Sequence, residues 1–123
     1  MTDEEFDEVV ALVDGYCRVL GVLVPKVKQG KASDEDKEAY ANALTGLDRE
    51  RERMAKAIAE KWSRYGALGR LRTRVPGSGP ALIPVLKDLR DLARFRIIDQ
   101  PDTRRVWEAR LRQIEWDIRR FYQ

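Results

Sequence analysis

One stretch of the chain, residues 47–66 (LDRERERMAKAIAEKWSRYG), restricts the possible fold more than any other. Its apolar residues recur at steps of three and four, which places them on one stripe of a helix. They are Leu47, Met54, Ala55, Ile58, Trp62 and Tyr65. The other face is charged, with Glu52 and Lys56 at helical-neighbour spacing, while Asp48 is a candidate N-cap and Gly66 a candidate stop. Other helices must cover such a stripe, and we expect its two aromatic side chains to anchor the core rather than bind a ligand.

The first of four further helices is predicted near the start of the sequence. A T-x-x-E capping box begins at Thr2, and acidic residues follow in the first turns, where the helix macrodipole favours negative charge. Apolar residues at helical spacing continue to about Leu20, and we expect the helix to end there because Gly21 and Pro25 follow. Cys17 lies on the apolar face, so we expect it to be a small core residue.

A loop and a short helix are predicted next. Residues 22–32 are typical of a loop and carry three lysines. An S-x-x-D box at Ser33 then begins a helix that reaches about Leu44, and the Thr-Gly pair at 45–46 separates it from the central helix. The alternative is that this break has no effect and that one continuous helix covers residues 34–65.

Residues 66–80 (GALGRLRTRVPGSGP) are the clearest linker, because they hold four of the eight glycines and two of the five prolines. Arg70, Arg72 and Arg74 alternate with uncharged residues. Alternation is also typical of a strand, but the sequence offers no partner strand. We therefore predict an extended basic connector, which either contacts nucleic-acid phosphates or is a solvated tether.

Two helices follow the linker and complete the predicted fold. One runs from about Leu82 or Pro84 to Phe95 with an apolar inward face, and the other covers residues 102–123 with Asp102 as its cap. The inward stripe of the last helix is Trp107, Leu111, Ile114, Ile118 and Phe121. We expect an all-α, single-domain protein (residues 1–123), a compact bundle of about five helices with the Gly/Pro-rich basic linker before the fourth.

Trp116 is the residue that the last helix leaves off its inward stripe. At 100° per residue it lies about 180° from Trp107. The basic residues on or near its side of the helix are Arg105, Arg112, Arg119 and Arg120. An aromatic residue among arginines stacks on nucleic-acid bases or anchors a protein partner, and we take these five as candidate partner-binding residues. The alternative is that Trp116 packs against the fourth helix or a second subunit.

The distribution of charge divides the chain in two. Residues 1–60 hold 9 Lys/Arg and 14 Asp/Glu, and residues 61–123 hold 15 and 7, so the net +3 combines −5 with +8. Thirteen of the 15 basic residues in the second half are arginines, whose planar guanidinium suits phosphate and carboxylate partners. The alternative is that the two halves neutralise each other within the fold.

The sequence lacks the residues on which most catalytic and metal sites depend. There is no histidine and only one cysteine, which excludes Ser-His and Cys-His triads, thiolate zinc sites and an internal disulfide. No phosphate-binding glycine motif is present. We expect no enzyme activity, cofactor or metal, with an arginine-based enzyme acting on a carboxylate as the remaining alternative. Since neither a signal peptide nor a membrane-spanning run is evident, we expect a cytoplasmic protein.

The order of motifs resembles a known family. An opening M-T-x-E-E-F with V-V-A-L-V, a short helix with Tyr40, and A-L-T-G-L-D at 43–48 before a longer helix are similar to the phage replicative-helicase loaders. The similarity covers about residues 1–92 and includes a proline turn at 75–80 that leads to a helix near Ile83. Arginines before this turn depart from the family, which carries apolar or aromatic residues there. The resemblance implies binding of a host replicative helicase and control of its delivery to single-stranded DNA, without catalysis.

Four hypotheses for function follow. The leading one is a small non-catalytic adaptor or inhibitor, phage-encoded, that binds a larger replication or nucleic-acid-processing protein. The second is direct binding of DNA or RNA through six arginines: Arg70, Arg72, Arg74, Arg105, Arg112 and Arg119. The third is a phage inhibitor of a host defence complex or polymerase. The fourth is a structural homo-oligomer with Trp116 at the subunit interface.

Overall fold

The computed structural model describes residues 1–122 and contains five α-helices and two 3₁₀ helices in that range. They are α1 (Asp3–Lys28), α2 (Asp34–Glu60), η1 (Trp62–Tyr65), α3 (Gly66–Arg74), α4 (Gly79–Asp99), η2 (Pro101–Thr103) and α5 (Arg104–Phe121). No strand occurs among the described residues, so the expected all-α bundle of five helices is confirmed. No helix in this part of the chain is both long and apolar enough to cross a lipid bilayer.

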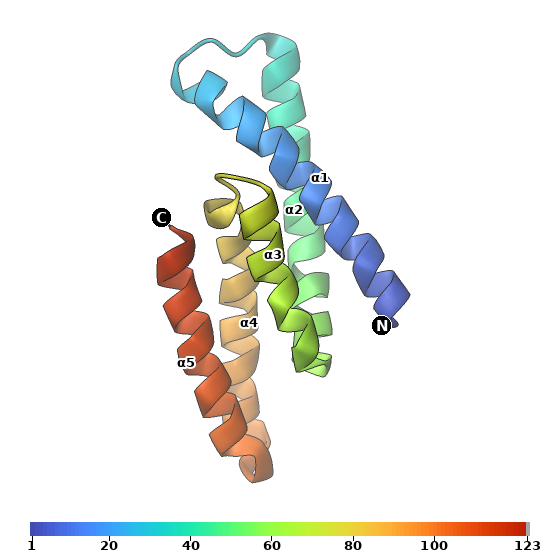
Figure 1. Ribbon diagram of the computed structural model, residues 1–123, viewed down its shortest axis with the longest axis vertical. Coiled ribbons are helices and arrows are strands. Elements are labelled where there is room, and N and C mark those ends of the chain that lie inside the picture. Colours follow the sequence, from blue (N-terminus) through green and yellow to red (C-terminus); the bar gives the residue numbers. More distant parts are fainter. Residues whose placement is uncertain (123) are drawn as a thin grey trace.

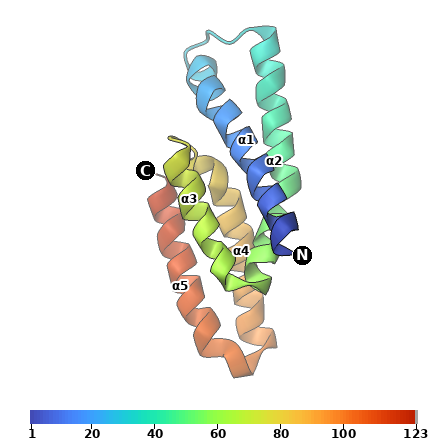
Figure 2. The same ribbon diagram turned by 45° about the vertical axis from the view of Figure 1, so that its right-hand side comes forward.

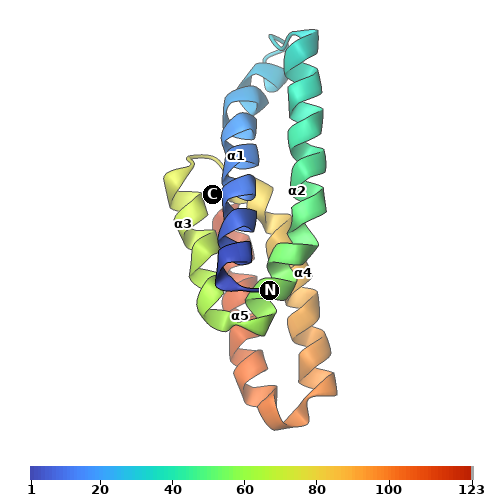
Figure 3. The ribbon, with the colours of Figure 1, turned by 90° about the vertical axis from the view of Figure 1, so that its right-hand side faces the viewer.

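Two helical hairpins make up most of the bundle (Figure 1). α1 and α2 form one hairpin, α4 and α5 form the other, and the two pack together through α2 and α4. The hairpins are offset along the long axis, so the α1–α2 connection projects at one end and the α4–α5 connection at the other (Figure 3). The short helix α3 runs alongside α4 (Figure 2). The middle of the molecule is therefore the place where α1, α2, α3 and α4 meet.

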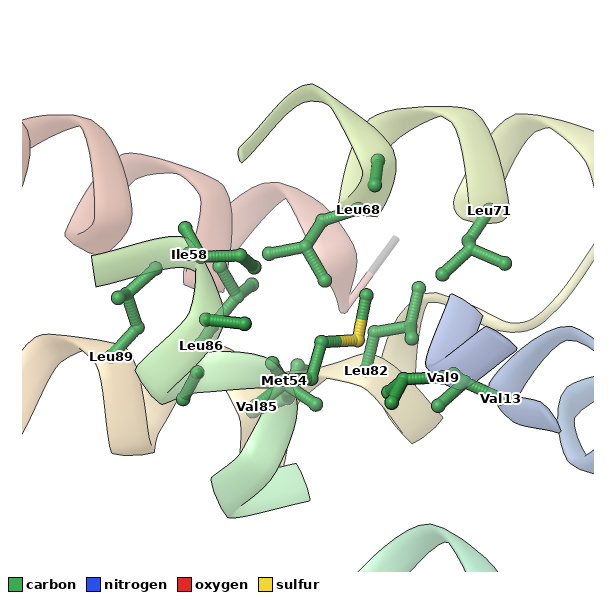
Figure 4. Close-up of a cluster of buried hydrophobic side chains, with 14 of the residues drawn as sticks. Val9, Val13, Met54, Ile58, Leu68, Leu71, Leu82, Val85, Leu86 and Leu89 are labelled. Atoms are coloured by element: carbon green, nitrogen blue, oxygen red, sulfur yellow. The ribbon is translucent and has the colours of Figure 1, made fainter. Parts of the chain in front are cut away.

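The centre of the core is formed by fully buried aliphatic side chains from these four helices (Figure 4). They are Val9 and Val13 of α1, Met54 and Ile58 of α2, Leu68 and Leu71 of α3, and Leu82, Val85, Leu86 and Leu89 of α4. Each buried side chain of this size stabilises the fold by about 1.5–3 kcal/mol. The core thus requires all four helices, and the short α3 contributes as directly as the long ones.

Helix α1 is longer than the sequence pattern predicted. It continues past Leu20 and ends at Lys28, with Gly21 and Pro25 inside it. The prediction of an end near Leu20 is wrong because the apolar stripe continues, and burial of Leu23 outweighs the weak helix propensity of Gly21 and the hydrogen bond that Pro25 does not donate. The loop expected over residues 22–32 is correspondingly reduced to 29–33.

Helix α2 has no break at residues 45–46, and Asp48 is an exposed residue within it rather than an N-cap. The alternative of one continuous helix is therefore correct, although the helix ends at Glu60 rather than Tyr65. Gly46 permits close packing instead of a break, because a Cβ atom on it would lie 2.3 Å from Cζ of Tyr16 in α1. The glycine is thus explained by the neighbouring helix, which the local sequence does not show.

The apolar stripe that begins at Leu47 is buried as predicted as far as Ile58. Lys61 then leaves the helical conformation, and Trp62 and Tyr65 lie in η1. Their rings stack with centroids 4.5 Å apart and pack, half-buried, against the core. They anchor the core as predicted, while Gly66 begins α3 instead of ending a helix.

The prediction of an extended linker over residues 66–80 is wrong for its first part. Residues 66–74 form helix α3, and only 75–78 connect it to α4. The buried side chains of α3, Ala67, Leu68 and Leu71, follow the helical spacing of three and four. The alternation of arginines with uncharged residues obscured this spacing. α4 in turn begins at Gly79, before the expected start at Leu82 or Pro84.

The predicted cap residues at the starts of α1 and α2 are confirmed, whereas α4 continues past the predicted end at Phe95 and ends at Asp99. Thr2 caps α1 by accepting a hydrogen bond from the Glu5 backbone N–H at 3.1 Å, and Ser33 and Asp36 form a complete capping box at α2. On α5 the inward stripe is confirmed, with Leu111 and Ile118 only half-buried. That helix begins at Arg104 rather than at residue 102. The prediction that Asp102 caps it is wrong, because Asp102 lies in η2 and Thr103 occupies the N-cap position.

A buried arginine, Arg64, ties the start of α1 to the end of α2. Its Nη1 donates to the Ala57 carbonyl at 2.9 Å, and its Nη2 donates to the Met1 carbonyl at 2.8 Å and to Asp3 Oδ1 at 3.1 Å. Lys61 also donates to this carboxylate, and together Lys61 and Arg64 lower the pKa of Asp3 below its usual value. At this point the acidic and basic parts of the chain do neutralise each other.

We expect Leu71→Ala to lower the free energy of unfolding by about 2–5 kcal/mol, because it leaves a cavity in the core. Thr73→Ala, at an exposed position of the same helix, should change it by less than about 0.5 kcal/mol. Urea unfolding followed by circular dichroism measures both. Equal small effects would mean that residues 66–74 do not pack as α3.

A second prediction concerns the thiol of Cys17, which is fully buried. Burial, with a smaller effect of Asp14, raises the pKa of this thiol from 9.0 to about 11. Since the unfolded chain loses the proton first, stability falls as the pH rises from 9 through 11. Between about pH 8 and 10 the thiol should lower the free energy of unfolding by about 1 kcal/mol. In the Cys17→Ala variant this decrease should be absent, whereas the pH dependence of stability that comes from the other titrating groups should remain.

Candidate functional site

Helix α5 presents two very different faces. Its buried face, with Trp107, Ile114 and Phe121, packs on the bundle. On the opposite face the Trp116 side chain is 56% exposed, so the alternative in which it packs against the fourth helix does not hold. A large aromatic side chain in solvent, fixed on a rigid helix, is a candidate anchor for a partner.

Four exposed arginines lie on the same side of α5 as Trp116. We call the set the Trp116 face: Arg105, Arg112, Trp116, Arg119 and Arg120. Arg120 Nη1 lies 3.6 Å from Asp117 Oδ1 of the same helix. For the other three arginines, no carboxylate of residues 1–122 lies within ion-pair distance. Since Arg105, Arg112 and Arg119 are seven residues apart, they repeat at about 10 Å along the helix.

Other arginines of the second half do have carboxylate partners within the fold. Arg94 Nη2 lies 3.4 Å from Glu115 Oε1, and Arg104 Nε lies 2.7 Å from Glu108 Oε1. These pairs flank the Trp116 face without reaching its centre. Neutralisation within the fold is therefore partial, and the face around Trp116 keeps its positive charge.

The three arginines predicted as a phosphate-binding connector do not form one patch. On a helix, Arg72 lies about 160° from Arg70. Arg72 extends toward the end of α5, where Nη2 donates to the Arg120 carbonyl at 3.2 Å and the guanidinium lies 5.2 Å from the Phe121 ring centroid. Arg74 faces α1, with Nε 3.9 Å from Asp14 Oδ2. Only Arg72 is therefore close to the Trp116 face.

The end of α5 is positioned by a close backbone contact with the start of α4. A Cβ atom on Gly79 would lie 2.2 Å from the Phe121 carbonyl oxygen, so only glycine fits there without displacing a helix. One turn earlier on α5, the buried carboxylate of Asp117 accepts hydrogen bonds from the Tyr65 hydroxyl and from Gln113 Nε2. Burial and this hydrogen bond raise the pKa of Tyr65. These contacts hold the helix that carries Trp116 in a fixed orientation.

A cation–aromatic cluster at the other end of α5 was not foreseen from the sequence. The guanidinium of Arg110 lies 4.5 Å from the Trp107 ring centroid and 4.9 Å from that of Trp62. Arg96 of α4 lies 5.0 Å from the same Trp107 ring. Burial and the nearby charge of Arg96 lower the pKa of Arg110. Only the Trp107–Arg110 spacing is visible in the sequence, because the other partners come from η1 and α4.

The described residues hold no group of three or more acidic, cysteine or histidine side chains that could bind a metal ion. Comparison of the chain with protein-family models, curated proteins and solved structures finds no match. The resemblance of residues 1–92 to helicase loaders therefore stays a prediction.

We expect Gly79→Ala to lower the free energy of unfolding by about 1–3 kcal/mol, because the added methyl group overpacks the contact with Phe121. The matched control is Gly69→Ala in α3, where a Cβ atom meets nothing within 4 Å. This change should raise the free energy of unfolding by about 0.5–1 kcal/mol through helix propensity. Thermal and urea unfolding of both variants measure the difference, and equal effects would contradict the close approach.

Proposed function

We propose that the protein is a non-catalytic adaptor that docks on an acidic surface of a larger protein through the Trp116 face. The observation that carries the proposal is an exposed tryptophan among four arginines, three of which (Arg105, Arg112 and Arg119) have no carboxylate partner within residues 1–122. The unpaired guanidinium groups are free to form bidentate pairs with carboxylates of another protein.

The composition of the Trp116 face is that of an interface hot spot. Tryptophan and arginine are the residues most enriched where truncation costs the most binding energy. Burial of the exposed part of the Trp116 ring removes apolar surface from water, and excluding water also strengthens the surrounding charge pairs. Because α5 is already packed on the bundle, docking of this face costs little backbone conformational entropy, and the ordering cost is mainly that of the arginine side chains.

Binding to a protein fits the geometry better than binding to nucleic acid. Surfaces for single strands stack successive bases on several aromatic residues along a basic groove, whereas this face holds Trp116 alone on a convex helix. The basic residues of α3 also divide between two sides of that helix. Direct nucleic-acid binding through the arginines remains the second candidate, supported by the seven-residue repeat of Arg105, Arg112 and Arg119.

The resemblance to phage helicase loaders makes a replicative helicase the first partner to test. The resemblance covers residues 1–92, so α5 and its Trp116 face lie outside it. Two of its features, a short helix with Tyr40 and a helix start at residues 47–48, are not present because α2 is continuous. A third, a proline turn before a helix, corresponds to residues 75–78 before α4. An inhibitor of a polymerase or defence complex would use the same face on a different target.

We expect Trp116→Ala and Arg112→Glu each to weaken binding to a purified bacterial replicative helicase by at least about tenfold, as expected for hot-spot residues. Their free energies of unfolding should change by less than about 0.5 kcal/mol. The matched controls are Phe95→Ala, an exposed aromatic residue of α4, and Arg49→Glu, an exposed arginine of α2. Biolayer interferometry measures affinity. Controls that weaken binding as much as the face variants would contradict the proposal.

Fluorescence anisotropy with labelled single-stranded DNA distinguishes the second candidate. If the arginines bind phosphates, affinity should fall steeply with salt, by a slope of about −0.7 for each phosphate contacted. If the protein is an adaptor, DNA binding should be absent or unaffected by Trp116→Ala. Tight, salt-dependent DNA binding that Trp116→Ala abolishes would overturn the adaptor proposal.

A further inference from the structure

The outer face of α1 carries apolar side chains that no other helix covers. Leu12, Val19 and Val22 are 46%, 39% and 62% exposed. α1 lies at the surface of the bundle over its whole length (Figure 3). Single exposed apolar residues are ordinary on a protein surface, but these three lie on one side of one helix, next to Gly15.

These residues belong to a repeat of seven that covers most of α1. One row of the repeat contains Glu5, Leu12, Val19 and Lys26, each seven residues after the last. The other row, three residues further on, contains Glu8, Gly15 and Val22. Residues alternating at steps of three and four with a period of 3.5 form the seam by which two helices pair in a coiled coil. We call these seven residues the α1 seam.

The α1 seam is apolar in the middle and oppositely charged at its two ends. Glu5 and Glu8 are exposed at the N-terminal end. Lys26, at the C-terminal end, is about half exposed, and its Nζ lies 3.8 Å from Asp36 Oδ2. In a parallel pair of such helices, like charges would oppose each other at both ends. In an antiparallel pair, the acidic end of each helix meets the basic end of the other.

The antiparallel arrangement also brings complementary shapes together. With a two-fold axis beside residue 17, Glu8 opposes Lys26 of the second copy, and Leu12 opposes Val22. Gly15 then opposes Val19. A Cβ atom on Gly15 would meet nothing within 4 Å in the monomer, so packing within one chain does not require a glycine there. Its absent side chain leaves room for the valine of the other helix.

We propose that α1 pairs with α1 of a second copy as an antiparallel two-stranded coiled coil, so that the protein is a homodimer. The contact is isologous, because each helix supplies the same residues to both halves of the interface. From Glu8 to Lys26 it extends about 27 Å along the helix. It uses α1, whereas the proposed adaptor function uses α5, so a test that contradicts one proposal does not contradict the other.

Exchange of the end charges tests this register. We expect Glu8→Lys alone and Lys26→Glu alone each to weaken dimerisation by about tenfold or more, since each places like charges opposite one another at both ends. The double variant, Glu8→Lys with Lys26→Glu, should restore the wild-type dissociation constant. An equimolar mixture of the two single variants should form a heterodimer, because position 8 of each chain then faces the opposite charge at position 26 of the other. Sedimentation velocity over a concentration series measures each constant.

Two further variants separate an effect on the interface from an effect on folding. Gly15→Leu should weaken the dimer, because its side chain would occupy the space of Val19 of the second copy. It should raise monomer stability, because leucine is the better helix former and its Cβ meets nothing within 4 Å in the monomer. Glu38→Lys changes the net charge as much as Glu8→Lys. Because Glu38 is an exposed residue of α2, outside the α1 seam, this variant should leave dimerisation unchanged. A wild-type protein that stays monomeric at every accessible concentration would overturn the proposal. So would a dimer that none of the α1 seam variants affects.

Discussion

Packing of α2 against α4 is the interaction on which the rest of the structure depends. It is the main contact between the two hairpins, and it buries Met54 and Ile58 among the aliphatic side chains of α4. At the edge of this contact Arg51 binds Asp88 with two parallel hydrogen bonds of 2.9 Å, which also fixes the rotation of one helix against the other. Without it, α3 would lose the surface formed where the two hairpins meet.

The direction of the Trp116 side chain is a consequence of that core. α5 has one buried stripe, and once Trp107 and Phe121 occupy their places against the bundle, the opposite side of the helix must face solvent. Gly79 and the Tyr65–Asp117 hydrogen bond then hold the end of the helix. The exposed tryptophan is thus maintained by buried contacts on the other side of the same helix, which is the arrangement that a rigid docking surface needs.

The two proposed interaction surfaces lie on different hairpins, and this has a consequence for binding. A dimer formed through the α1 seam would carry two Trp116 faces. If both reached acidic surfaces of one oligomeric target, the second contact would be intramolecular and would raise the overall affinity without any new residue. If only one reached the target, dimerisation would change only how binding depends on the concentration of the protein. Dimerisation therefore affects how the adaptor binds its target, whereas the choice of target depends on α5.

The sequence by itself determined the helical class, the caps at Thr2 and Ser33 and the side of α5 on which Trp116 lies, because these depend on spacing within one helix. Only the tertiary structure decided where helices end and which arginines gather. A Gly or Pro signal is worth about 1–3 kcal/mol against a helix, and burial of one or two side chains, each worth about 1.5–3 kcal/mol, outweighs it. Gly46 lies within a continuous helix where Tyr16 packs closely against it, and residues 66–74 are helical because Leu68 and Leu71 reach the core. Those partners are distant in the chain, so no local pattern contains them.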